Sequence, residues 1–109
     1  MAFKITELPT FTRDVPVLIP HGEAHVEQSL KTVFKMVADE ALDDFNLLET
    51  QGSIDTVKAV VQAFPDVEGI DGSPRASTPE LIEELARVPY IRQAVLNAYF
   101  TNITKVKRN

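Results

Sequence analysis

The sequence predicts a mainly helical protein of the α+β class, in which an N-terminal β-hairpin or extended arm is followed by about four amphipathic helices. Three observations predict this fold. Prolines interrupt the first third of the chain, at Pro9, Pro16 and Pro20. Apolar residues recur at helical spacing from Ala38 onward. The segment 77–80, Ser-Thr-Pro-Glu, is typical of a helix start.

Length and composition predict one soluble domain over residues 1–109. The chain has 109 residues and a mass of 12.1 kDa, and 44% of its residues are hydrophobic. It has no cysteine, which excludes a disulfide framework and thiolate chemistry and fits a reducing cytoplasm. Because no apolar run approaches about 18 residues and no signal peptide is recognisable, we expect a protein that is neither membrane-spanning nor exported.

Residues 1–37 are predicted to form the hairpin or arm. Phe11–Ile19 fits an edge strand, and His21-Gly22 supplies a turn. Val26–Val37 is rich in β-branched and apolar residues and fits a second strand. An alternative stays open, in which the chain from Lys31 onward already belongs to the next helix.

Residues 38–64 are predicted to form two helices joined by a short link. The first helix is expected to end near Gln51-Gly52, and its apolar stripe consists of Ala38, Ala41, Leu42, Phe45 and Leu48. Ser53 fits the N-cap of the second, whose stripe ends before Pro65: Ile54, Val57, Val60, Val61 and Phe64.

Residues 65–77 are predicted to form a loop, residues 78–104 two more helices, and residues 105–109 a basic tail. The third helix begins either with a capping box from Ser77 to Glu80 or with a Thr78 cap and Pro79 at the first helical position. Pro89 opens the fourth helix, Tyr90 to about Thr104.

The fourth helix carries more apolar surface than one side of a helix needs. Two neighbouring stripes cover over half of its circumference: Ile91, Val95, Ala98 and Tyr99 in one, and Leu96, Phe100 and Ile103 in the other. Either a small domain packs against this helix on two sides, or one stripe is a surface for self-association or for a partner. The candidate surface residues are Ile91, Val95, Leu96, Tyr99, Phe100 and Ile103, and the stripe of Leu96, Phe100 and Ile103 is the predicted subunit contact.

The charge pattern argues against nucleic-acid binding. The net charge is -5, and twelve of the sixteen acidic residues but only three of the eleven basic ones lie between Met36 and Ile91. A nucleic-acid surface needs clustered basic residues, and the only such cluster is Lys105, Lys107 and Arg108.

No motif predicts a catalytic, cofactor or metal site. His21 and His25 have the spacing of a metal pair but follow a turn, and no further ligand cluster accompanies them. The acidic residues of the 65–77 loop do not have the spacing of a calcium loop. We therefore expect a protein that is not an enzyme and takes no cofactor.

The second half of the chain resembles the tail assembly chaperones of long-tailed, siphovirus-type bacteriophages. The resemblance depends on the ordered combination of these residues: Val60-Val61, Phe64, Val67, Asp71-Gly72, Pro74, Ser77 to Glu80, Leu81, Ile82, Leu85, Pro89, Ile91, Ala94-Val95, Ala98-Tyr99 and Arg108-Asn109. Members of the family often have tryptophan where this chain has Phe64.

This resemblance implies a helical homo-oligomer without enzymatic activity. Its implied partners are the tape measure protein, which it keeps soluble, and the tail tube protein, whose assembly it promotes. It implies a location in the host cytoplasm during assembly, absence from the mature virion, and a longer product made by ribosomal frameshifting near residues 105–108. Two alternatives stay open: a small DNA-associated regulator using the last two helices, and a structural head-tail connector or tail terminator.

Overall fold

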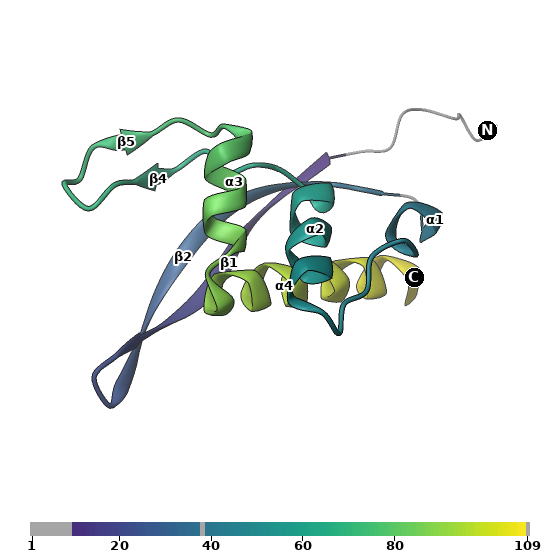
Figure 1. Cartoon of the computed structure of the whole chain (residues 1–109), viewed down its shortest axis with the longest axis horizontal. Helices are drawn as coiled ribbons and strands as arrows, with labels where there is room; N and C mark the ends of the chain where they lie inside the picture. The colour runs from purple at the N-terminus through teal and green to yellow at the C-terminus, as the bar shows by residue number, and fades with distance from the viewer. Residues whose placement is uncertain (1–9, 38, 109) are drawn as a thin grey trace.

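The computed structural model describes residues 10–37 and 39–108, and for residue 39 and residues 103–108 it describes the backbone alone. The arm before residue 10, the predicted helix start at Ala38, the end of the tail at Asn109 and the side chain of Ile103 therefore lie outside the described part. Figure 1 shows the arrangement of the elements.

A long antiparallel hairpin opens the described chain, as predicted. Strand β1 (Thr10–His21) pairs with β2 (Ala24–Lys35) over their whole length, from Thr10 opposite Lys35 to His21 opposite Ala24. The turn between them holds Gly22 with φ 62°. A glycine at the first central position is what a type II′ hairpin turn requires.

The expectation of a mainly helical protein is wrong, because the fold is α+β with a substantial sheet. The strands β1 and β2 have 12 residues each and are longer than every described helix except α4. A short third strand, β3 (Val61–Ala63), adds to β2, so that the antiparallel order is β1-β2-β3. The predicted α-helix through Val61 and Phe64 instead ends where its β-branched residues pair with the sheet.

The predicted helix from Ala38 to near Gln51-Gly52 is wrong as well. The observed helix α1 (Asp39–Leu42) has only four residues, and the chain then turns irregularly before α2 (Thr50–Val60). The Asn46 side chain accepts a hydrogen bond from the Leu48 N–H at 3.0 Å and donates one to Glu49. Such local bonds compete with helix formation, and Leu48 remains 96% exposed.

Ser53 does not cap α2, contrary to prediction. Helix α2 begins three residues earlier, and the Ser53 hydroxyl donates to the Leu47 carbonyl at 3.0 Å. Gly52 is buried within the helix, where the backbone of Asn46 crosses so closely that any Cβ would overlap it. The absence of a side chain at Gly52 thus lets the α1–α2 connection lie against the helix.

The segment 65–77, predicted as a loop, contains a small hairpin made of β4 (Val67–Glu68) and β5 (Pro74–Arg75). This hairpin projects to one side of the molecule (Figure 1). At its base the Ser77 hydroxyl accepts a hydrogen bond from the Phe64 N–H at 2.8 Å. Ser77 is thus used to anchor the hairpin and does not cap a helix.

The two C-terminal helices are placed as predicted. Helix α3 (Pro79–Ala86) has Pro79 in its first turn, and the Thr78 hydroxyl accepts from the Leu81 N–H at 3.1 Å, which is the second of the two caps considered. Helix α4 (Pro89–Arg108) begins at the expected proline and continues four residues beyond Thr104.

The core lies between the sheet and the helices α2, α3 and α4 (Figure 1). Its centre is aromatic: the Tyr99 ring centroid lies 5.6 Å from that of Phe34 and 6.4 Å from that of Phe11. The Tyr99 hydroxyl also accepts a hydrogen bond from the Val37 N–H at 3.2 Å. Helix α4 is thereby fixed to both long strands.

Candidate functional site

The six predicted surface residues on α4 do not form one exposed surface. Val95 and Tyr99 are fully buried and Leu96 is 8% exposed, so these three belong to the core of the protein itself. Ile91 and Phe100 are half-buried and pack against that core. The predicted stripe of Leu96, Phe100 and Ile103 is thus partly internal, which corrects its placement as an outward surface over the residues described.

The physical reason is that α4 has neighbours on more than one side. It packs against β1 and also against α2 and α3. The broad apolar arc of the helix therefore serves one small core that surrounds it, which is the first of the two alternatives raised from the sequence. Two grooves with apolar lining residues flank α4.

The first groove, here called the neutral groove, lies between β1 and the outer side of α4. From β1 come Pro16 and Leu18, and from α4 come Tyr90, Gln93, Ala94, Asn97, Ala98, Thr101 and Asn102. None of these residues is charged. Leu18 is 56% exposed and Tyr90 38% exposed, so large apolar surfaces of both elements meet solvent here.

Small residues line the α4 side of the neutral groove. Ala94 and Ala98 lie one helical turn apart, and Tyr90 precedes them by another turn. Asn102 closes one end, where its side-chain oxygen accepts from Arg13 Nε at 3.0 Å while its amide donates to the Ala98 carbonyl at 2.7 Å. These two bonds fix the Asn102 side chain at that end of the groove.

The β1 edge beside the neutral groove is poorly suited to receive another strand. β1 is an outer strand of its sheet, and the two-residue turn makes His21–Ala24 a hydrogen-bonded pair. Every second backbone nitrogen of β1 then points away from β2. Pro16 and Pro20 occupy two of these outward-facing positions. Because proline has no N–H, this edge lacks two donors that an added strand would need.

The second groove, here called the acidic groove, lies on the other side of the start of α4 and has a volume of about 520 Å³. It extends between the middle of the β1–β2 hairpin, β4, the end of α3 and the first turn of α4. Its apolar lining residues are Val17, Ile19, Leu30, Val67, Leu85 and Ile91. Asp66 and Glu68 provide two carboxylates, no basic residue lines the groove, and neither carboxylate forms an ion pair with any residue in the described ranges.

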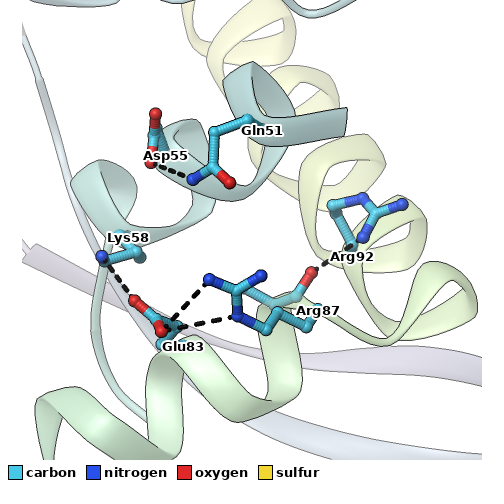
Figure 2. A network of polar contacts seen from close by, with 7 residues as sticks. Gln51, Asp55, Lys58, Glu83, Arg87 and Arg92 are labelled. Carbon is cyan, nitrogen blue, oxygen red and sulfur yellow. Dashed lines mark hydrogen bonds and ion pairs between the residues drawn. The ribbon is translucent and has the colours of Figure 1, made fainter. Parts of the chain in front are cut away.

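The other charged residues of this region are paired. Figure 2 shows Glu83 between Lys58 of α2 and Arg87, at 2.8 Å from Lys58 Nζ and 3.3 Å from Arg87 Nη2. Hydrogen bonding from Lys58 is the main cause that lowers the pKa of Glu83, and Arg87 adds to it. Arg75 is paired with Glu84 in the same way and lowers the pKa of that carboxyl.

Other titratable residues noted in the sequence are not brought together. His21 and His25 lie on opposite faces of the hairpin, because they pair with Ala24 and Pro20 respectively. The Asp71 carboxylate accepts from the Ser73 N–H and hydroxyl, both at 3.0 Å, and these bonds lower its pKa. Over the residues described, no three histidine or acidic side chains are grouped as metal ligands would be.

Sequence reasoning missed both grooves. It identified Ile91, which lines the acidic groove, and placed Ala98 in an apolar stripe, but it did not single out Leu18 or Ala94 of the neutral groove. The available signal was the weak one of an apolar residue, Leu18, between two edge prolines. Glu68 was considered only among the acidic residues of the 65–77 loop, since the β4–β5 hairpin that positions it was not predicted.

Comparison with known proteins identifies no relative: no protein-family model, no curated protein and no solved structure matches the chain. Among the described helices, none combines the length and the apolar content that crossing a membrane requires.

Proposed function

We propose that this protein is a non-enzymatic, self-associating chaperone that keeps a long, apolar, helical partner in solution. In the setting that the resemblance implies, the partner is the tape measure protein of a long-tailed phage, and the complex promotes assembly of tail tube subunits around it. The chaperone acts in the host cytoplasm during assembly and is absent from the mature virion. The observation that best supports the proposal is the neutral groove.

The chemistry of the neutral groove fits an apolar helix better than any other occupant. The lining has no charge to neutralise, and exposed apolar surface is contributed by Leu18 and Tyr90. Ala94 and Ala98 allow the backbone of a docked helix to approach α4 closely, as in other helix-in-groove contacts. The prolines of β1 disfavour an added strand at the same place.

Soluble yield of the partner tests this proposal. The chain is co-expressed with the tape measure protein of the same phage, and the soluble fraction of the latter is measured. We expect the wild-type chain to raise that fraction several-fold, and Leu18→Asp or Thr101→Glu to abolish the effect by placing a charge in the neutral groove. Val26→Asp is the matched control, because Val26 is 45% exposed on the opposite face of the hairpin and lines neither groove.

Other outcomes contradict the proposal. If the wild-type chain leaves the tape measure protein insoluble and instead binds duplex DNA with strong salt dependence, the protein is a DNA-associated regulator. If it is recovered stoichiometrically from purified virions, it is a structural component of the particle.

A further inference from the structure

The acidic groove combines two features that rarely occur together on a free surface. Six partly or fully buried apolar residues line it, and Asp66 and Glu68 stand at it without an ion pair to any residue in the described ranges. By contrast, the neighbouring Glu83 and Glu84 are both paired with basic side chains. An occupant that fits this groove must offer apolar side chains together with basic ones.

The chain itself contains a segment of that composition. After Asn102 the sequence reads Ile-Thr-Lys-Val-Lys-Arg, and these residues form the last turns of α4. The segment holds three of the eleven basic residues of the chain and no acidic residue. Its charge is complementary to the acidic groove, and its two apolar residues match the apolar lining.

This segment cannot enter the groove of its own molecule. Ile91, in the first turn of α4, lines the acidic groove, and Lys107 follows it sixteen residues later on the same helix. At 1.5 Å per residue, α4 carries Lys107 about 24 Å away from Ile91. Figure 1 shows the end of α4 and the β4–β5 hairpin at opposite ends of the long axis of the molecule.

We infer that the acidic groove of one copy binds the basic C-terminal turns of α4 from a second copy. The contact is heterologous, because the two surfaces differ and lie at opposite ends of helix α4. Repetition of such a contact gives a closed ring or an open chain, in contrast to the single pair that a two-fold contact gives. The inference supplies the contact for the self-association in the proposed function.

Charge reversal tests this contact with the protein alone. The groove variant is Asp66→Lys with Glu68→Lys, and the tail variant is Lys105→Glu with Lys107→Glu. Masses are measured by light scattering and sedimentation over a range of concentrations at low and high salt. For the wild type we expect a mass several times 12.1 kDa that falls on dilution and on addition of salt. Each variant alone should have an apparent dissociation constant raised at least tenfold.

Mixing the two variants gives the decisive result. The groove variant keeps a wild-type tail that fits the acidic groove of the tail variant, and its own basic groove fits the acidic tail of the other. We therefore expect the equimolar mixture to assemble although each variant alone does not. The control Asp43→Lys with Glu80→Lys makes the same change in net charge at exposed acidic residues outside the groove and should assemble as the wild type does.

Several outcomes would overturn the inference. A wild-type protein that is monomeric at every concentration excludes the contact, as does a groove variant that assembles normally while retaining its circular dichroism spectrum. Assembly of the wild type without recovery in the mixture indicates a different interface. Loss of tape measure binding in the groove variant with unchanged self-association assigns the groove to that partner instead. The mass measurements contain no tape measure protein. They therefore test the contact between copies even if the chaperone proposal fails.

Discussion

Tyr99 connects the helical layer to the sheet through both packing and a hydrogen bond. Its ring lies against Phe34 and Phe11 of the hairpin and meets Phe100 edge-on at 5.4 Å. Its hydroxyl accepts from the N–H of Val37, at the point where the chain leaves β2. A buried phenol is favourable where its polar end has a partner, and here that partner is supplied by the backbone.

Tyr99→Phe isolates the contribution of that hydroxyl. The ring packing stays, whereas the half-buried Val37 N–H loses its acceptor. We expect a loss of about 1 to 2 kcal/mol in the free energy of unfolding, measured by urea denaturation. Tyr90→Phe changes a more exposed residue and should leave stability unaltered. Equal stability of wild type and Tyr99→Phe would show that water replaces the hydroxyl.

Gly52 is a second position at which one residue decides local structure. In most exposed helix interiors, Gly→Ala is stabilising by about 1 kcal/mol. Here we expect Gly52→Ala to be destabilising by about 1 to 3 kcal/mol, because the new Cβ overlaps the Asn46 carbonyl and the α1–α2 connection must move. Thermal unfolding compared with the exposed control Gln51→Ala checks the sign. A rise in melting temperature for Gly52→Ala would contradict this close contact.

Gly52 also shows why the predicted helix boundary at this position was wrong. Gly52-Ser53 between two apolar stripes is typical of a helix end followed by a new N-cap. What decides the structure is the approach of the Asn46 backbone and the bond from Ser53 to the Leu47 carbonyl, and both depend on where a neighbouring segment lies. In contrast, the helix start at residues 77–80 was predicted correctly because its signals lie within one turn, although the choice between a Ser77 and a Thr78 cap stayed open.

At the scale of elements, ion pairs link the helices to one another and the small hairpin to α3. Glu83 of α3 binds Lys58 of α2, and Glu84 binds Arg75 of β5. The pKa of each carboxyl is lowered by its basic partner, through hydrogen bonding first and charge second. A carboxyl with a lowered pKa in the folded state adds stability above its unfolded-state pKa and loses that contribution as the pH falls through the lowered value.

Acidification should therefore lower the thermal stability of the wild type more than that of a variant without these carboxylates. We expect the melting temperature of the wild type to fall as the pH drops below the usual glutamate value of 4.5, and the fall to be smaller in Glu83→Gln with Glu84→Gln. Both groups are exposed, so the difference should be modest and should shrink in high salt. Parallel pH profiles for the two proteins would show that these pairs do not contribute.

Prediction was uneven among the elements for a physical reason. The hairpin and α3 were predicted because their turn and cap signals are local. The end of α2 at Val60 was not, since the choice between continuing the helix and forming β3 depends on an unpaired edge of β2, which the sequence does not display. The β-branched pair Val60-Val61 was compatible with either outcome.

At the scale of the whole molecule, the candidate surfaces follow from how α4 is enclosed. The sequence indicated that this helix has excess apolar area but not which part would face outward, because that depends on how three neighbouring elements, β1, α2 and α3, pack against it. Leu96 and Tyr99 became internal once β1, α2 and α3 packed around the helix. The grooves on either side of it arise only from the assembled fold, so no local pattern predicts them.

The contact between Phe11 and Tyr99 also has a consequence for biosynthesis. Because the ribosome adds the hairpin to the chain before α4, the apolar face that carries Phe11 and Phe34 is first made without the helix that covers it. Pro16 and Pro20 remove two N–H donors from the β1 edge, so that edge is a poor partner for another strand even before α4 is in place.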